Sequence, residues 1–283
     1  MKVLDGKKIA AEIIQEIKAE VDLLVGRKPG LAFILVGDNA ASQSYVRAKQ
    51  KACAKAGIHS FLLEFPSSIS QQELLVHIET LNRDPAVDGL LVQLPLPPQI
   101  SEAAINLAID PTKDADGFHP LNVGKMLLGH DTASLPCTPH GIQVLLARSG
   151  VQVRGKHVVI VGRSNIVGKP LAAILMQKKQ DANATVTICH SQSDHLAHIT
   201  KMADILVAAI GQPGFIRKEM VKEGAVVVDV GISRVDGKIV GDVDFPHVAP
   251  LTSHISPVPG GVGPMTIAML LQNVLANYKA RLL

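Results

Sequence analysis

Tryptophan is absent from this chain of 283 residues, tyrosine occurs twice, cysteine occurs three times, and the formal net charge is only +3. So few aromatic side chains and so small a charge argue against a nucleic-acid-binding protein, which needs rings for base stacking and a basic surface for phosphates. The three cysteines, Cys53, Cys137 and Cys189, are far apart. We therefore expect no disulfide framework and a reducing, cytoplasmic location.

Long hydrophobic runs are also missing. No apolar stretch approaches the roughly 20 residues that cross a bilayer, and residues 1–6 lack the apolar core of a signal peptide. We therefore expect no membrane partner. The 11 histidines show no metal-ligand spacing, and His195 and His198 have no partner acid, so we predict no metal site.

Hydrophobic residues make up 47% of the chain and charged residues 19%, and the length is comfortable for two domains. Ser70 and Glu73 have the spacing of a capping box at a helix N-terminus. Strands alternating with helices predict a parallel α/β domain in the first half. The expected elements cover residues 7–24, 31–36, 40–56, 60–65, 70–81 and 88–94.

The second half shows the same alternation. Thr138 and Pro139 suit the N-cap and first turn of a helix that ends at Gly150. Residues 110–137 before it are rich in loops, which are uncommon at this length unless they bind something. Beyond this helix we expect strands over 157–161, 184–188, 204–209 and 225–230, short helices that begin near residues 168, 193 and 215, and a final helix over 266–281.

A glycine-rich turn joins the expected strand 157–161 to the helix that begins near Gly168. Strand, tight turn and helix form the start of a dinucleotide-binding unit, because the helix N-terminus presents N–H groups and partial positive charge to phosphate. The usual Gly-x-Gly-x-x-Gly is altered: Ser164 replaces the second glycine, and the last glycine comes one residue late. Spacing alone leaves open a phosphate loop for another ligand, or a turn that binds nothing.

No acidic residue follows the next strand, which ends at Cys189-His190-Ser191. An NAD-selective site normally has Asp or Glu there to bond the ribose 2′-hydroxyl. Arg163 in the glycine turn and Ser191 past the strand end both suit a 2′-phosphate instead. The sequence therefore predicts NADP as the cofactor.

Tyr45 and Lys49 lie at i and i+4 on the expected helix 40–56 and share one face. This face can look into a cleft between two lobes. A lysine beside apolar and aromatic groups loses part of its preference for the charged form, so it can exchange a proton near neutral pH. The alternative is an ordinary surface lysine beside a core tyrosine.

Three further positions are candidates for chemistry. The Gln93 amide, at the end of a strand, can hold an ammonium or a substrate carbonyl, and the alternative is a plain polar strand end. Asp114 or Asp116 could accept hydrogen bonds from a nitrogen heterocycle, and the alternative is a turn or capping role. Cys137 has no base tied to it, so a structural thiol is favoured over a nucleophile.

Six motifs occur in an order that spans nearly the whole chain. They are Tyr45–Lys49, Asp88–Pro97, Lys113–Phe118, Pro136–Pro139, Gly162–Pro170 and Pro257–Thr266. This ordered set closely resembles the bifunctional methylenetetrahydrofolate dehydrogenase/methenyltetrahydrofolate cyclohydrolase family, which shares the altered glycine turn. One departure is Ser256, where threonine is more common before Pro-Val-Pro-Gly-Gly, but the hydroxyl is kept.

The resemblance implies a fold of class α/β. An N-terminal α/β substrate lobe would be followed by a Rossmann-like, doubly wound dinucleotide-binding lobe, and the C-terminal helix would return to the first lobe. We expect the folate-binding catalytic domain over residues 1–138, the NADP domain over 139–264 and the returning helix over 265–283.

The resemblance also implies an oxidoreductase and hydrolase of one-carbon metabolism and purine biosynthesis. NADP would oxidise 5,10-methylenetetrahydrofolate, and water would hydrolyse the 5,10-methenyl product to 10-formyltetrahydrofolate. The partners would be tetrahydrofolates, which can carry polyglutamate, with no nucleic acid and no membrane. Such enzymes are homodimers, usually through the cofactor lobe.

The family's site residues correspond to specific positions in this sequence. Lys49 would be the key catalytic residue, and Gln93 would position it. Tyr45 would stack on the aminobenzoyl ring of the folate, and Asp116 would bind the pterin. The folate would also contact Val92, Leu94, Pro257, Val258, Pro259, Gly260 and Gly261. The cofactor would contact Gly162, Arg163, Ser164, Ile166, Val167, Gly168, Ser191 and Ile232.

Two alternatives stay open. Another NADP dehydrogenase with an N-terminal α/β substrate lobe, such as a shikimate-type enzyme, would also use a cleft lysine, although segments 93–97 and 257–266 argue against it. A non-catalytic NADP-binding regulatory protein would have no need of Lys49, Tyr45 and Gln93 together. Folate-dependent turnover separates both alternatives from the dehydrogenase/cyclohydrolase.

Overall fold

The structure, a computed structural model, describes residues 1–132 and 134–282 and divides into two compact units. Unit 1 comprises Met1–Ala10 and Pro136–Thr266, and unit 2 comprises Ala11–Leu135 and Ile267–Leu283. The main sheet of each unit is parallel, which confirms the predicted α/β class. No helix among the described residues is long and apolar enough to cross a membrane.

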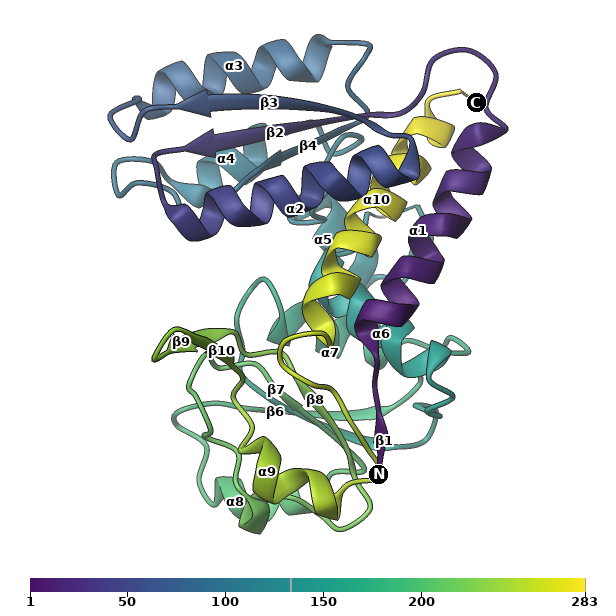
Figure 1. Ribbon diagram of the computed structural model, residues 1–283, viewed down its shortest axis with the longest axis vertical. Coiled ribbons are helices and arrows are strands. Elements are labelled where there is room, and N and C mark those ends of the chain that lie inside the picture. Colours follow the sequence, from purple (N-terminus) through teal and green to yellow (C-terminus); the bar gives the residue numbers. More distant parts are fainter. Residues whose placement is uncertain (133, 283) are drawn as a thin grey trace. The chain divides into compact units, whose positions relative to one another are not determined.

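The sheet of unit 2 has the strand order β3-β2-β4. These strands are β2 (Gly30–Val36), β3 (His59–Phe65) and β4 (Gly89–Val92). Helix α3 (Gln71–Arg83) covers one face of the sheet, and α2 (Ala40–Ala56) covers the other (Figure 1). Central strand β2 is therefore buried throughout, as expected for a parallel strand with both faces covered.

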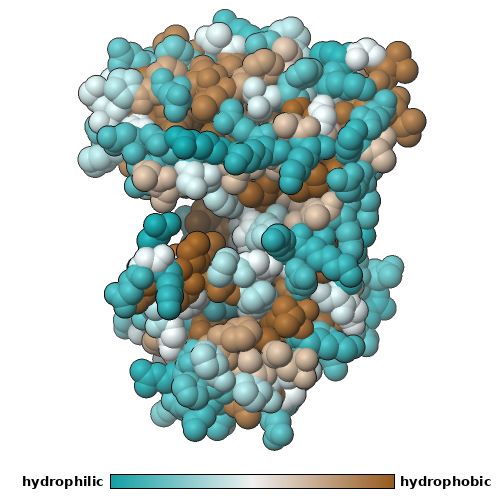
Figure 2. Space-filling view, in the orientation of Figure 1, coloured by the Kyte–Doolittle hydropathy of each residue, from teal (hydrophilic) through white to brown (hydrophobic). Residues whose placement is uncertain are grey.

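Helix α2 occupies the predicted residues because its two ends are strongly signalled. The Asn39 side chain accepts hydrogen bonds from the N–H groups of Ala41 and Ser42, and Gly57 follows with a left-handed φ of 74°. The outward side of α2 forms a hydrophilic band across unit 2 (Figure 2). Its buried residues include Val46, Lys49 and Cys53, so a lysine lies on the apolar face of this helix.

The capping box predicted at the start of α3 is present. Ser70 Oγ accepts the N–H of Glu73 at 3.2 Å, and Glu73 Oε2 accepts the N–H of Ser70 at 3.0 Å. We expect Ser70→Ala to lower the free energy of unfolding by about 1 kcal/mol, because the N–H of Glu73 loses its acceptor. Urea unfolding measures the change, and exposed Ser68→Ala is the control. Equal midpoints for the two variants would contradict the capping role.

Two helices of unit 2 were not predicted. They are α4 (Glu102–Ala108) and α5 (Pro120–Leu127). Residues 110–137 were expected to be rich in loops, and α5 was missed there: His119 Nδ1 accepts the N–H of Leu121, and Pro120 opens the helix. Each is short and has few buried side chains, so periodicity had little to detect.

Two long helices contain residues of both units. They are α1 (Gly6–Asp22) and α10 (Val262–Ala280), and most residues of each belong to unit 2. Asn273 of α10 donates to the carbonyl groups of Ala115 and Leu135 at 2.9 Å. The last residue of the expected C-terminal segment, at position 283, lies outside the described residues.

The main sheet of unit 1 has the strand order β1-β11-β8-β7-β5-β6. The strands are β1 (Lys2–Val3), β11 (His254–Ile255), β8 (Val226–Asp229), β7 (Ile205–Ala208), β5 (His157–Val161) and β6 (Thr185–Cys189). Strand β5 lies between β6 and β7, where the strand order reverses, and ligands bind at such a point beyond the carboxyl ends. Residues 1–10, expected with the first domain, group with unit 1 because β1 pairs with β11.

The connections of unit 1 correct several expectations. The helices are α6 (Cys137–Arg148), α7 (Gly168–Leu175), α8 (Leu196–Lys201) and α9 (Phe245–Val248). Two short 3₁₀ turns also occur, η1 (Lys218–Met220) and η2 (Ala249–Leu251). Strands β9 (Ser233–Val235) and β10 (Lys238–Val240) form a hairpin. The helix expected near residue 215 was wrong, because only η1 follows it. Thr138 is not an N-cap: its hydroxyl pairs with that of Thr266 at 2.9 Å.

Candidate active site

Lys49 lies on the buried face of α2 and is only 4% exposed. Its Nζ donates a hydrogen bond to Gln93 Oε1 at 3.1 Å and lies 5.0 Å from the centroid of the Tyr45 ring. The negative face of the ring attracts the ammonium. The alternative of an ordinary surface lysine was therefore wrong, and the structure brings Tyr45, Lys49 and Gln93 together.

Gln93 holds Lys49 because its own amide is fixed. It follows β4 directly, its N–H donates to Ile34 O, and its Nε2 donates to Leu94 O at 2.8 Å. The amide oxygen is thereby turned toward Lys49. Val92, at the end of β4, is buried, and Leu94 is half-buried before a cis bond to Pro95.

The two aspartates of the 114–116 segment have different roles. Asp114 is buried and accepts hydrogen bonds from the backbone N–H groups of Gly117, Phe118 and His119, so it has the turn role that the sequence left open. Asp116 is half-buried. Burial raises the pKa of the Asp116 carboxyl, while the charge of Lys49 opposes that rise. Asp116, and not Asp114, is therefore free to recognise a heterocycle.

The other expected folate-contact segment, Pro257–Gly261, belongs to unit 1. The Val258–Pro259 peptide is cis, and Gly260 has a φ of 108°. The N–H of Gly261 donates to Pro257 O at 2.8 Å, which closes the segment into a tight turn. Its residues 257–260 remain partly or fully accessible.

The glycine turn after β5 is as tight as the motif predicted. Gly162 has a φ of 123°, and a Cβ built on Gly168 would lie 2.1 Å from Gly162 O. Ser164, at the place of the usual second glycine, has its Oγ accept the N–H groups of Val167 and Gly168 at 3.1 and 3.4 Å. The serine thus stabilises the turn that leads into α7.

The side chains around this turn suit an anionic ligand. Arg163, Ser164 and Ile166 are exposed, and so is Ser191 beyond the end of β6. Val167 is buried against the unit, and Ile232, after β8, is 63% exposed. With two positions that admit no Cβ, and an exposed arginine beside them, the turn fits a dinucleotide phosphate.

The cysteines do not supply an alternative nucleophile. All three are buried free thiols. Burial raises the pKa of the Cys53 thiol to about 12, so the thiol near Lys49 stays protonated. Within residues 1–132 and 134–282, no group of three or more His, Cys, Asp or Glu side chains could hold a metal ion.

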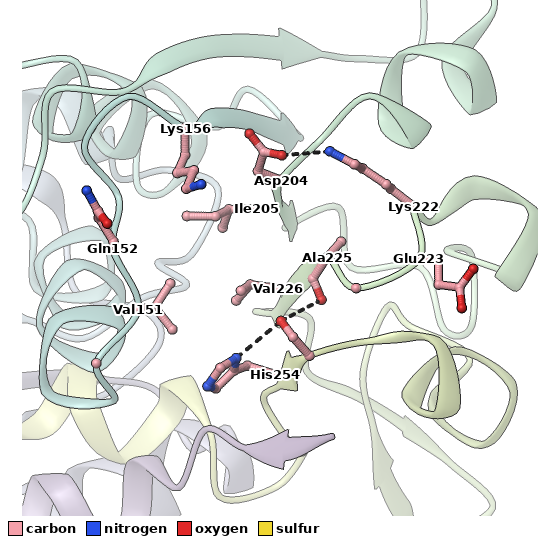
Figure 3. Close-up of a pocket in the computed structure, with 13 residues that line it drawn as sticks. Val151, Gln152, Lys156, Asp204, Ile205, Lys222, Glu223, Ala225, Val226 and His254 are labelled. Atoms are coloured by element: carbon pink, nitrogen blue, oxygen red, sulfur yellow. Dashed lines mark hydrogen bonds and ion pairs between the residues drawn. The ribbon is translucent and has the colours of Figure 1, made fainter.

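A cavity of about 500 Å³ lies at the amino ends of β7, β8 and β11 (Figure 3). Lys222 reaches Asp204 there at 2.7 Å, while Glu223 points away from the cavity. Because the strands are parallel, this edge of the sheet is opposite to the glycine turn. Because it lies at the edge of the sheet opposite to the glycine turn, this cavity is not the candidate active site.

Sequence reasoning missed two buried acids of unit 1, Asp229 and Asp242, which are 2% and 0% exposed. Asp229 ends β8, at the edge where ligands bind, and this position was the one available signal. Asp242 carries no signal in its sequence neighbourhood.

Comparisons with known proteins agree with this geometry. A family model described as "Tetrahydrofolate dehydrogenase/cyclohydrolase, NAD(P)-binding domain" matches residues 136–282, and one described as "Tetrahydrofolate dehydrogenase/cyclohydrolase, catalytic domain" matches residues 4–116. The chain is 57% identical over 279 residues to the Bifunctional protein FolD of Halalkalibacterium halodurans, with 98% of each chain covered.

Solved structures give the same result. The bifunctional FolD methylenetetrahydrofolate dehydrogenase/cyclohydrolase of Campylobacter jejuni is 49% identical, with a TM-score of 0.96 over 99% of each chain. The Trypanosoma brucei enzyme, complexed with NADP cofactor and inhibitor, is 41% identical, with a TM-score of 0.92 over 99% of this chain and 98% of that one. The Aquifex aeolicus shikimate dehydrogenase, at 12% identity and a TM-score of 0.52 over 88% of this chain and 92% of that one, is similar in fold alone. The chain belongs to the tetrahydrofolate dehydrogenase/cyclohydrolase family.

Proposed function

We propose that Lys49 carries the hydrolytic reaction of this bifunctional enzyme and that the glycine turn of unit 1 holds NADP. The enzyme oxidises 5,10-methylenetetrahydrofolate with NADP and hydrolyses 5,10-methenyltetrahydrofolate to 10-formyltetrahydrofolate. The observation that carries the proposal is the buried Lys49 Nζ, bonded to Gln93 beside the Tyr45 ring. Two absorbance assays test it, one for NADPH formation and one for loss of the methenyl compound.

In the hydrolysis, the main task of the protein is to transfer protons. The methenyl carbon is already cationic, so water adds to it without a Lewis acid, and a carbon–nitrogen bond then breaks. Lys49 moves protons between the attacking water and the departing nitrogen. Within the described residues, the structure gives Lys49 one hydrogen bond, to Gln93, so its other donor positions are available to water and substrate.

Tyr45 and Asp116 would orient the substrate. The Tyr45 ring offers a face on which the aminobenzoyl group stacks. Because burial disfavours the charged form of Asp116, this carboxyl needs a partner that donates hydrogen bonds, and a pterin supplies them. Val92, which ends β4, and Leu94, which follows it closely, would also contact the folate.

NADP would be held by residues of unit 1 at the carboxyl edge of its sheet. When bound, it accepts the hydride removed from the methylene carbon. Gly162 and Gly168 let the backbone approach a pyrophosphate, and Ile166 and Val167 would border it. Arg163, Ser164 and Ser191 would hold phosphate oxygens, while exposed Ile232 would give an apolar contact.

Arg163→Ala tests the assignment of the 2′-phosphate. We expect kcat/KM for NADP to fall by about 10- to 100-fold, the size of a lost charge-assisted hydrogen bond, and kcat/KM for NAD to change far less. Initial rates with both cofactors give the ratio. Arg154→Ala, an exposed arginine of the same unit, is the control. If Arg163→Ala lowers both values equally, the arginine does not read the 2′-phosphate.

Assembly and setting are part of the same proposal. We infer a homodimer that forms through unit 1, where edge strand β6 presents Ile188 with 36% of its surface exposed. The dimer would work in the cytoplasm on folates that can carry polyglutamate and would supply formyl groups for purine biosynthesis. Light scattering in solution measures the mass of the assembly.

A further inference from the structure

Two buried carboxylates of unit 1 have no part in the chemistry described so far. Asp229 is the last residue of β8, and Asp242 follows the β9–β10 hairpin. They are 2% and 0% exposed. Acidic side chains are almost never fully buried unless they are bonded to partners that need them.

The partners of Asp242 are backbone groups of the loop after β7. Its Oδ2 accepts the N–H of Ile210 at 2.7 Å and the N–H of Gly211 at 3.0 Å. One carboxylate oxygen therefore fixes the first turn of this loop. The other oxygen, Oδ1, has no hydrogen-bond partner among the described residues.

Asp229 fixes the segment that carries Asp242. Its Oδ1 accepts the N–H groups of Gly231 and Asp242 at 3.1 and 2.9 Å, and its Oδ2 accepts that of Val243 at 3.0 Å. Burial raises the pKa of Asp229 to about 6, the Asp242 charge adds to this rise, and the backbone N–H groups oppose it. Asp229 thus fixes the position of Asp242. It also fixes Gly231, the residue that precedes Ile232.

Glycines pack closely against these carboxylates, at distances that leave no room for a side chain. A Cβ built on Gly231 would lie 2.1 Å from Asp242 Oδ1, and one built on Gly241 would lie 1.9 Å from Asp229 Oδ2. On the other side, a Cβ built on Gly162 would lie 2.2 Å from Ala209 O. The loop that Asp242 holds therefore lies directly against the glycine turn.

We propose that Asp242 is a positioning residue for NADP. It touches no cofactor itself: it holds the N–H groups of Ile210 and Gly211 so that the loop after β7 and the glycine turn after β5 keep one shape. Asp229 holds Asp242 and the Gly231–Ile232 segment in register with that loop. The inference rests on the proposed placement of NADP at the glycine turn.

Asp242→Ala and Asp242→Asn separate positioning from general stability. Alanine removes the acceptor of two N–H groups, and we expect the Kd for NADP to rise by about 10- to 100-fold, the cost of small misplacements in a preorganised site. Asparagine keeps an oxygen that can accept the N–H groups of Ile210 and Gly211. Its amide nitrogen replaces Oδ1, the oxygen that has no hydrogen-bond partner among the described residues. We expect this variant to bind NADP with nearly the wild-type Kd. Calorimetric titration of the full-length proteins with NADP measures both values.

Asp244→Ala is the matched control, because Asp244 lies in the same segment and its side chain bonds only exposed His247 among the described residues. Hydrolysis of the methenyl compound, which needs no NADP, is the second readout. An unchanged Kd in Asp242→Ala overturns the inference. A parallel loss of NADP binding, hydrolysis and thermal stability, without rescue by asparagine, overturns it as well and assigns Asp242 to the core. If wild type binds no NADP, or Arg163→Ala leaves cofactor use unchanged, the proposed cofactor site fails instead.

Discussion

We expect Lys49→Ala to lower the rate of 5,10-methenyltetrahydrofolate hydrolysis by about 10²- to 10⁴-fold, the range that a positioned general acid–base group contributes. The reason is the buried position of Lys49 Nζ, which Gln93 holds at 3.1 Å beside the Tyr45 ring. Alanine removes the amine that exchanges protons and leaves both neighbours in place. Loss of methenyl absorbance measures the rate.

NADP binding should survive the same substitution, because Lys49 belongs to unit 2 and the glycine turn to unit 1. Lys51→Ala is the control: it lies on the same helix, its side chain is exposed, and we expect wild-type hydrolysis. Hydrolysis at the wild-type rate in Lys49→Ala would show that another group moves the protons. If the wild-type protein catalyses neither reaction, the assignment of both activities is contradicted.

Helix α2 shows how far local pattern predicts this fold. Its residues, 40–56, are those that the sequence predicts. The cap at Asn39 begins the helix and the left-handed Gly57 ends it, and both signals act within one turn. The same locality explains the capping box at Ser70 and the glycine turn after β5. Spacing also placed Tyr45 and Lys49 on one face, although it could not decide whether that face is buried.

Features that depend on distant residues could not be predicted in this way. Strands β1 and β11 contain two residues each and are far apart in the sequence, so no periodicity identifies them. Asp242 was missed because its partners, Ile210 and Gly211, belong to another loop. The turn role of Asp114 is local, but spacing alone does not show whether Asp114 or Asp116 accepts the N–H groups of residues 117–119.

Asp88→Ala should lower the free energy of unfolding of unit 2 by about 3 kcal/mol, near the lower end of the cost of breaking a buried ion pair. Asp88 is fully buried and accepts hydrogen bonds from Arg27, Arg281 and the N–H of Gly30 at 2.6–2.9 Å. Alanine leaves Gly30 without an acceptor and two guanidinium groups without a counter-ion. Since these arginine side chains are 41% and 30% exposed, water recovers part of the loss.

The chain supplies its own probe for this measurement. It has no tryptophan, and both of its tyrosines, Tyr45 and Tyr278, belong to unit 2. Tyrosine fluorescence during urea unfolding therefore reports on unit 2, whereas far-ultraviolet circular dichroism reports on both units. We expect Asp88→Ala to move the midpoint of the fluorescence change to a lower urea concentration. The part of the circular dichroism change that reports on unit 1 should keep its midpoint.

Burial distinguishes Asp88 from the ion pair between Lys18 and Asp22, which is just as short. That pair has a distance of 2.5 Å, but its side chains are 44% and 56% exposed, so breaking it should cost less than about 1 kcal/mol. Asp22→Ala is accordingly the matched control in the same unit. If both variants shift the fluorescence midpoint equally, the loss of a buried counter-ion is not what destabilises Asp88→Ala. In that case, Asp88 does not hold the start of β2 and the C-terminal Arg281 together.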